Sequence, residues 1–212
     1  MKTFSKALVA AAVLGTSVAT QAELSANVGL VSDYYFRGID QASSATASAG
    51  LDYESNGFYI GTWTADVNDG LEIDGYLGYG LDIGEISVGV GFTTYQYTGD
   101  FDSEYNEFNF TAGFGPLSLE YTVGEQDEDN SIGIDGGDYD FVALTYENNG
   151  FYGTYGSFGD DFDGDYIELG YGTTISEIDF GIALVVSDEE LVANSDERDE
   201  SLVFSMSKTF DL

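Results

Sequence analysis

Residues 71–92 read LEIDGYLGYGLDIGEISVGVGF. Apolar side chains recur at nearly every second position of residues 71–81 and again of residues 86–92, and polar residues or glycines lie between them. A period of two is typical of a β-strand with one apolar and one polar face, because successive side chains of a strand point to opposite sides. The short connection at residues 82–85 suits a tight turn. This stretch therefore predicts two antiparallel strands joined as a hairpin.

The same alternation continues along the chain and predicts twelve strands. They span residues 24–36, 43–53, 58–66, 71–81, 86–97, 105–114, 117–124, 139–147, 151–158, 165–174, 178–186 and 201–212. Most of these segments have about 9–11 residues, which is the length that a tilted strand needs to cross a bilayer. Strands of soluble proteins are usually shorter. Strand length therefore favours a membrane protein.

The connections between these segments alternate in length. Five of them are tight and several contain Asn-Gly or Gly-Pro: residues 54–57, 82–85, 115–116, 148–150 and 175–177. Most of the others are longer and acidic, such as residues 125–138 and 187–200. Short turns at one end and long loops at the other are typical of transmembrane barrels, whose termini lie on the short-turn side. The sequence therefore predicts an all-β fold, a transmembrane antiparallel up-and-down β-barrel of about 12 strands.

The N-terminus has the features of a cleaved signal peptide. Lys2 and Lys6 precede the short apolar stretch 7–15, and residues 20–22 resemble a cleavage site with small residues. The apolar stretch is too short for a transmembrane helix. We therefore expect residues 1–22 to be a signal peptide and residues 23–212 to form the barrel, located in the outer membrane of a Gram-negative bacterium.

The charge of the chain is extreme, with 39 acidic and five basic residues. Removal of Lys2 and Lys6 leaves Arg37, Arg198 and Lys208 against the 39 acids, a net charge of −36. Such a chain is unsuited to nucleic acid, which requires clustered basic residues. The acids either form a solvated surface that keeps the protein dispersed, or create a negative field that concentrates cations at a channel mouth.

Two readings of the strand faces remain open, because carboxylates opposite the apolar stripe would face solvent in a soluble sandwich and the lumen in a barrel. Aromatic residues near the expected strand ends favour the barrel, since such proteins carry aromatic girdles at the membrane interfaces. These residues are Tyr34, Phe36, Tyr53, Phe58, Tyr97, Phe114, Tyr121, Tyr146, Phe151, Tyr166 and Phe210. Aromatic residues also suit strands in general, which is the alternative explanation.

Residues 24–41 read LSANVGLVSDYYFRGIDQ. The core of this stretch, SDYYFRGI at residues 32–39 followed by Gln41, resembles the opening of the TorF family of porins, also known as a bacterial family of unknown function. Asp40 stands where that family has Ser or Thr. The length and strand rhythm of the mature chain agree with the family as well. The resemblance implies an outer-membrane porin and supplies no substrate.

Charged residues on the polar faces are candidates for the pore lining. They are Asp33, Arg37, Glu72, Asp74, Glu107, Glu120, Glu168 and Asp179. Even positions of residues 24–36 are expected to face lipid, which turns Asp33, Tyr35 and Arg37 toward the lumen. Arg37 is either a structural residue that satisfies carboxylates of neighbouring strands or a positive element of a constriction.

The chain has no histidine and no cysteine. Ser–His and Cys–His nucleophile systems and zinc sites built from these residues are therefore excluded, and we expect neither an enzyme nor a cofactor. Alternating acids around a glycine in residues 159–165 suggest a Ca²⁺ loop with Asp160, Asp161, Asp163 and Asp165 as ligands. The stretch lacks the terminal Glu of an EF-hand, and the alternative is an ordinary hydrophilic loop.

Three functions follow from these observations. The first is a channel for passive diffusion of small hydrophilic solutes with a preference for cations, because rings of Asp and Glu favour cations. The second is a non-conducting barrel with a structural or adhesive role, whose acidic loops contact lipopolysaccharide through divalent cations. The third is a soluble secreted β-protein. The expected partners are outer-membrane lipid, lipopolysaccharide and small solutes or cations.

Overall fold

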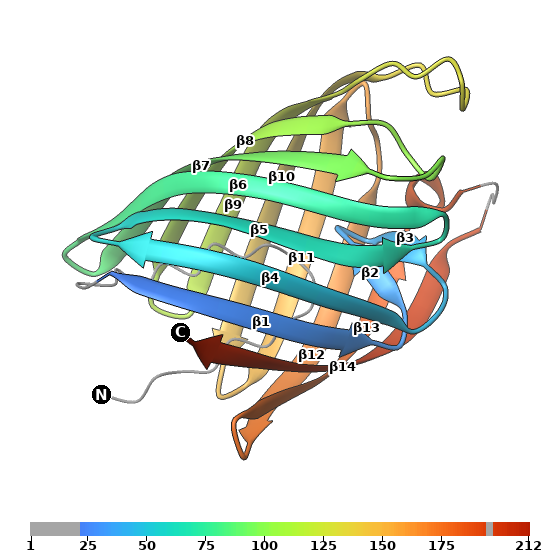
Figure 1. Ribbon diagram of the computed structural model, residues 1–212. Coiled ribbons are helices and arrows are strands. Elements are labelled where there is room, and N and C mark those ends of the chain that lie inside the picture. Colours follow the sequence, from blue (N-terminus) through green and yellow to red (C-terminus); the bar gives the residue numbers. More distant parts are fainter. Residues whose placement is uncertain (1–21, 194–196) are drawn as a thin grey trace.

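The computed structural model describes residues 22–193 and 197–212 (Figure 1). All of the expected signal peptide except Ala22 lies outside these residues. The barrel strands are β1 (Glu23–Val31), β4 (Thr46–Ser55), β5 (Phe58–Val67), β6 (Gly70–Ile83), β7 (Ile86–Tyr97), β8 (Tyr105–Phe114), β9 (Leu117–Gln126), β10 (Gly137–Asn148), β11 (Phe151–Asp160), β12 (Asp165–Ile175), β13 (Ile178–Ser187) and β14 (Asp199–Asp211).

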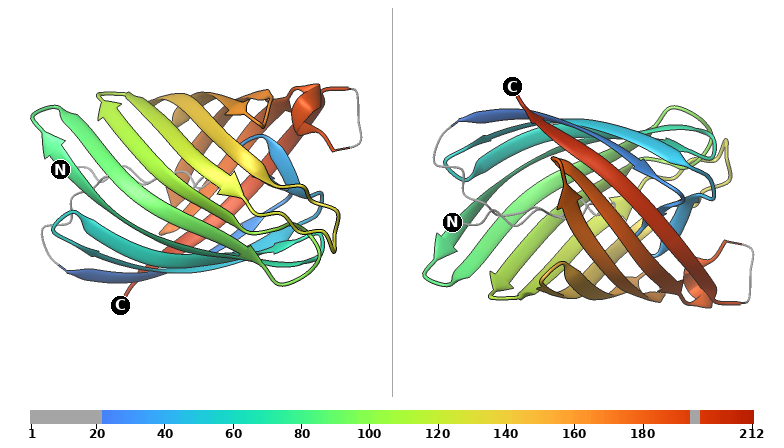
Figure 2. Two further views of the ribbon diagram at one scale, coloured as in Figure 1. Left: turned by 90° about the horizontal axis from the view of Figure 1, so that it is seen from above. Right: turned by 90° about the horizontal axis from the view of Figure 1, so that it is seen from below.

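The twelve strands form one closed antiparallel barrel, as Figures 1 and 2 show. Each strand pairs with its neighbour in the chain, apart from β1, which pairs with β4, and the barrel closes where β1 pairs with β14. Closure satisfies the backbone hydrogen bonds of both terminal strands, so no open edge remains. The predicted up-and-down barrel of about 12 strands is confirmed. Among the described residues, no helix is long and apolar enough to cross a membrane.

The apolar stripe of each strand faces outward. On β6, for example, Leu71, Ile73 and Leu77 are 39–46% exposed, whereas Glu72 and Asp74 are 2% and 6% exposed. The same contrast recurs on the other barrel strands, so large apolar side chains cover the outer wall. Monomeric soluble proteins rarely expose a continuous apolar surface of this extent. The outer wall is therefore suited to lipid.

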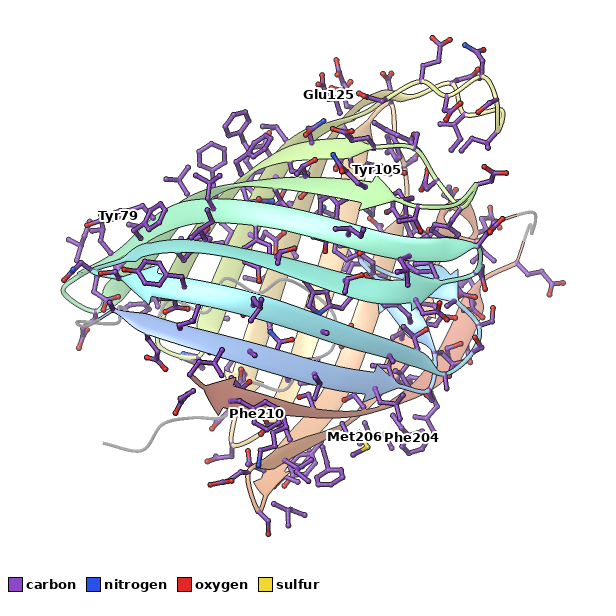
Figure 3. The ribbon with its side chains drawn as sticks, in the orientation of Figure 1. Tyr79, Tyr105, Glu125, Phe204, Met206 and Phe210 are labelled. Atoms are coloured by element: carbon purple, nitrogen blue, oxygen red, sulfur yellow. The ribbon has the colours of Figure 1, made fainter. Side chains whose placement is uncertain are left out.

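Exposed aromatic side chains gather on the outer wall close to the short turns. This set comprises Tyr53, Phe58, Tyr79, Phe114, Tyr146, Phe151, Tyr171 and Phe210. In Figure 3, Tyr79 and Phe210 point outward near this end, and Phe204 and Met206 point outward farther along β14. Four predicted girdle residues are corrected, because Tyr34, Phe36, Tyr97 and Tyr166 pack inside the barrel instead.

The first predicted strand is too long. It was expected over residues 24–36, but β1 ends at Val31 and the chain then leaves the barrel wall. Residues 32–45, here called the inner hairpin, contain β2 (Tyr34–Phe36) and β3 (Ile39–Ala42), which pair only with each other. The apolar alternation runs on through Tyr34 and Phe36, so periodicity alone gives no sign of this departure.

The turn of the inner hairpin explains how the chain reverses inside the barrel. Arg37 and Gly38 separate the paired residues Phe36 and Ile39, and both have positive φ angles of 49° and 81°. Two consecutive left-handed residues define the type I′ turn, which matches the twist of the flanking strands. The next barrel strand starts at Thr46 rather than at residue 43 as predicted. All other strand bounds lie within three residues of the predicted ones.

Candidate functional site

The inner hairpin lies across the barrel interior at the end with the long loops, where Figure 1 shows β2 and β3 within the outline of the wall. Three buried apolar clusters surround it. Tyr34 and Ala42 pack with Ala65 and Val67 of β5, and Tyr35 packs with Val185 and Val203 of β13 and β14. Ile39 packs against the third cluster, on β10 and β12. The hairpin is therefore part of the packed interior.

Arg37, at the tip of the hairpin, joins two strands of the opposite wall. Its guanidinium bonds both carboxylate oxygens of Glu107 on β8, and it donates to Glu120 on β9 at 2.8 Å. Arg37 is 8% exposed and Glu107 only 1%. The guanidinium carbon also lies 4.4 Å from the ring centroid of Phe141. A fork of donors paired with carboxylates is the geometry in which arginine binds most strongly.

Burial and the two carboxylates act in opposite directions on the pKa of this arginine. Burial lowers the pKa of Arg37, whereas Glu107 and Glu120 raise it, and the resulting pKa lies well above the ordinary arginine value. The arginine is therefore charged, and two carboxylates neutralise it. Of the two roles left open by the sequence, this geometry matches the structural arginine that satisfies carboxylates of neighbouring strands.

Further polar groups complete the coordination of Glu107. Tyr95 on β7 donates to it at 3.0 Å, Tyr139 on β10 donates at 2.5 Å, and Asn109 donates at 2.9 Å. The buried carboxylate is thus bonded by groups from its own strand, from β7 and β10, and from the hairpin. Buried networks of this kind are rigid when every member has a partner.

Other strands bond to the rest of the hairpin. The Tyr34 hydroxyl donates to Glu72 on β6 at 2.8 Å, and the Tyr35 hydroxyl bonds Asp199 on β14. The Ser187 hydroxyl on β13 donates to the carbonyl oxygen of Gly38. Together with the Arg37 contacts, these bonds tie the hairpin to β6, β8, β9, β13 and β14. The hairpin is therefore anchored around most of the circumference.

Glu72 and Asp74 form a second acidic group on the inner face of β6. They are two residues apart on one strand, so their side chains share a face about 7 Å apart. Asp74 is 6% exposed, and its Oδ1 atom has no hydrogen-bond partner among the described residues. A buried carboxylate without a partner destabilises a fold.

We expect Asp74→Asn to raise the thermal midpoint of the folded barrel by an amount equivalent to about 1–2 kcal/mol, because it replaces a buried carboxyl group, which has one oxygen without a partner and lies beside Glu72, with an uncharged amide. Thermal unfolding in detergent, followed by heat-modifiable migration on gels, measures the shift. Asp179→Asn is the matched control, since Asp179 also faces inward but accepts a bond from Thr174 and so should not gain stability. A lower midpoint for Asp74→Asn would contradict this explanation.

The remaining predicted lining residues lie apart from these two groups. Glu168 on β12 accepts a hydrogen bond from Tyr152, and Asp179 on β13 accepts one from Thr174. Asp33 lies in the bend between β1 and β2. Arg37, Glu107 and Glu120 are thus the predicted residues that the fold brings into direct contact.

Several interior residues were not predicted from the sequence, because only charged side chains were considered as candidates for the lining. Asn109 and Thr122 follow Glu107 and Glu120 by two positions, so the same period of two would have placed them on the inner face. Both bond to the Arg37 group. Asp102, in the loop after β7, and the hydroxyl donors Tyr34 and Tyr139 have no comparable local signature.

The half of the lumen near the short turns has a different character. Many of its inward positions carry small or polar residues that remain partly accessible: Ser48, Gly50, Gly61, Gly78, Ser87, Gly89, Thr111, Gly113, Ser118, Thr145, Thr154, Gly170, Gly172, Gly181, Ser205 and Ser207. The rings of Tyr59, Tyr76 and Tyr152 lie over three of these glycines, Gly78, Gly61 and Gly170. At the long-loop half, most inward side chains are buried around the hairpin. The short-turn half of the interior is therefore the more accessible half.

The expected Ca²⁺ loop lies between β11 and β12. Asp160 ends β11 with a positive φ of 74°, and the Asp161 carboxylate accepts a bond from the backbone of Asp138. Across the part of the chain that the structure describes, no three or more His, Cys, Asp or Glu residues are grouped to hold a metal ion. Calcium binding by Asp160, Asp161, Asp163 and Asp165 stays a prediction from the sequence.

One protein family matches most of the chain. The model of Gcw_chp, described as a bacterial protein of unknown function, matches residues 16–202. This agrees with the resemblance of residues 32–41 to a bacterial family of unknown function, whereas the match does not carry the name TorF. No curated protein matches the chain.

Solved structures share the barrel at low sequence identity. One, from a study of the mechanism behind the in-meso crystallization of membrane proteins, has a TM-score of 0.62 and 12% identity, over 90% of this chain and 84% of that chain. OpdK of Pseudomonas aeruginosa with vanillate has a TM-score of 0.44 and 14% identity, over 81% of this chain and 58% of that one. A BenF-like porin of Pseudomonas fluorescens Pf-5 has a TM-score of 0.40 and 12% identity, over 86% and 59%. The chain thus spans less than two thirds of these two porins, and the similarity concerns the fold alone.

Proposed function

Since the chain belongs to the Gcw_chp family of bacterial proteins of unknown function and forms a closed barrel, we propose that it is an outer-membrane channel for small hydrophilic solutes. The observation that carries this proposal is the division between the two faces of one wall. Large apolar side chains cover the outside, and carboxylates, hydroxyls and glycines line the inside. Only a closed barrel with such faces satisfies both lipid and an aqueous interior.

The same wall supports a position in the membrane. Exposed rings such as Tyr53, Tyr79 and Phe210 form a belt near the short turns, where amphipathic rings suit the boundary between lipid and water. In barrels of the outer membrane the short turns face the periplasm. In this orientation the inner hairpin and the long loops lie on the outer side, and the more accessible half of the interior faces the periplasm.

The charge of the interior supports a preference for cations. Arg37 is neutralised by Glu107 and Glu120, so it does not offer a positive ring to anions. Glu72, Asp74 and Glu168 also face the lumen, without a basic residue bonded to them in the described part of the chain. Acidic linings attract cations and repel anions. Passive diffusion through a narrow, acidic constriction is therefore the proposed mechanism.

We expect the reconstituted protein to conduct small currents in planar bilayers and to show a cation-selective reversal potential under a KCl gradient. The conductance is small because the inner hairpin fills the long-loop end of a barrel whose size lies between side-chain-filled and wide-pore barrels. Heat-modifiable migration on gels shows beforehand that the sample is folded. An anion-selective reversal potential would overturn the proposed preference, and a folded protein without conductance would overturn the channel itself.

The second candidate function is a non-conducting barrel with a structural or surface-adhesion role. The dense packing of the inner hairpin is the observation that favours it. In that case the acidic loops 127–136 and 188–198 would contact lipopolysaccharide through divalent cations. Loss of the surface phenotype on trimming these loops, together with the absence of solute flux, distinguishes this function from the channel.

A further inference from the structure

A pocket lined by aromatic rings lies beside the inner hairpin at the long-loop end. Seven aromatic residues contribute rings: Phe36, Tyr95, Tyr97, Tyr105, Tyr139, Phe158 and Phe162. They come from the hairpin, from β7, β8, β10 and β11, and from the loop after β11. Asp102 and the paired Arg37 and Glu107 contribute the charged groups of the lining. Neighbouring rings support one another, with centroids 5.0 Å apart for Tyr139 and Phe162 and 6.1 Å apart for Tyr105 and Tyr139. The rings thus form a preformed wall.

The hydrogen-bond donors of this wall are largely committed to carboxylates. Tyr105 donates to Asp102 at 2.9 Å, while Tyr95 and Tyr139 donate to Glu107. Arg37 donates to Glu107, Glu120 and Thr122. A ligand therefore meets ring faces and oxygen lone pairs, whereas an anionic ligand would need free donors. The wall is suited to a ligand that brings positive charge.

Asp102 brings to the pocket a carboxylate that is bonded to no basic residue in the described structure, since Arg37 is paired with Glu107 and Glu120. It accepts hydrogen bonds from three neutral groups, the Ser103 backbone at 2.8 Å, the Tyr105 hydroxyl at 2.9 Å and the Gln126 amide at 2.8 Å. Burial raises the pKa of Asp102, although these bonds act in the opposite direction. A cation beside Asp102 would offset the cost of burying its charge. Glu107, in contrast, already has Arg37.

We propose that this pocket binds a small organic ammonium ion, with its alkyl groups against the rings and its charge beside Asp102. Aromatic rings attract cations through their faces, and cages of rings suit quaternary ammonium groups. A bare metal ion is a poor fit, because it requires several oxygen ligands and the wall is mostly carbon. An aromatic carboxylate would be repelled by Asp102 and Glu107.

The inference deepens the proposed channel, since it names the class of cation that the constriction would select. It rests on the proposed function for the route of the ligand through the barrel. Binding itself is measured on folded barrel in detergent, where no pore has to conduct. A failure of binding and a failure of conduction can therefore be told apart.

The test compares choline with 3,3-dimethylbutan-1-ol, which has the same shape and no charge, by isothermal titration calorimetry. We expect choline to bind at least about tenfold more tightly than the neutral alcohol, because the cation–π and Asp102 interactions need the charge. Asp102→Asn should weaken choline binding by about tenfold, and Phe162→Ala should weaken it as well. Asp100→Asn is the matched control, since Asp100 lies exposed in the same loop, and it should leave the affinity within about twofold.

Gel migration before and after heating verifies that each variant is folded. Equal affinity for choline and the neutral alcohol would overturn the proposal. Choline binding unchanged by Asp102→Asn, or tighter binding of benzoate than of choline, would overturn it as well. Conductance without choline binding would overturn this inference and leave the proposed channel standing. Choline binding without conductance would support the binding site and overturn the channel.

Discussion

A barrel in which an Asn-Gly turn replaces residues 32–45 is expected to conduct several times more current than the intact protein. Val31 and Thr46 are directly opposite in the register between β1 and β4, so a two-residue turn can join them without shifting the ladder. The replacement removes the inner hairpin from the long-loop half of the lumen. The remaining opening is then set by the barrel wall alone. Single-channel recording in planar bilayers measures the increase.

The same replacement removes Arg37 and leaves Glu107 and Glu120 without their counter-charge. The reversal potential under a KCl gradient should therefore move closer to that of a purely cation-selective pore. A matched control shortens the loop after β9, which Figure 1 shows projecting beyond the barrel. Because Gln126 and Gly137 are also paired, the same turn can replace residues 127–136 and should leave the conductance unchanged. Equal conductance of both shortened variants would show that the hairpin does not restrict the pore.

The second large effect concerns stability. Arg37→Met is expected to lower the free energy of unfolding by about 3–5 kcal/mol, because it leaves a buried carboxylate pair without a cation. Glu107 is only 1% exposed, so water cannot replace the lost partner without opening the interior. Arg37→Lys should fall between, since one ammonium cannot reproduce the fork that bonds Glu107 and Glu120 together. Urea unfolding in detergent, followed by heat-modifiable migration on gels, measures the free energy of unfolding of the parent and of the two Arg37 variants.

Two further variants test whether the charge is the cause. The double variant Arg37→Met with Glu107→Gln should recover part of the loss, because the unpaired charge is then absent. Arg198→Met removes an arginine that is exposed in the loop before β14, and its effect should remain within about 0.5 kcal/mol. Every non-glycine residue at position 37 meets the same left-handed backbone, so these comparisons isolate the side chain. An Arg37→Met barrel as stable as the parent would refute the explanation.

The barrel wall could be predicted from the sequence because each wall strand has lipid on one side and lumen on the other. This constraint imposes the period of two, and β7 and β8 occur at the predicted residues 86–97 and 105–114. The alternation of short turns and long loops indicated that each strand pairs with the next one in the chain. The alternation of apolar and polar residues was therefore enough to locate the strands wherever the wall is regular.

The interior could not be predicted to the same extent, because its contacts join residues that are far apart in the chain. Arg37 lies 70 residues before Glu107 and 83 before Glu120, and no local pattern links them. The inner hairpin also continues the apolar alternation of β1, which concealed its start. The Arg37-Gly38 pair was the one local indication of a reversal, since glycine suits a turn that needs positive φ.

The long reach of the inner hairpin has a consequence for how the protein folds. Tyr35 bonds Asp199, which lies 164 residues later, and Ser187 bonds Gly38, which lies 149 residues earlier. Contacts of such high sequence separation form late, because their loop-closure entropy is lost before they contribute. We therefore expect the interior contacts to form after β1 has paired with β14 and closed the barrel. Exclusion of water from the packed region around the hairpin is then a late step of folding rather than its nucleus.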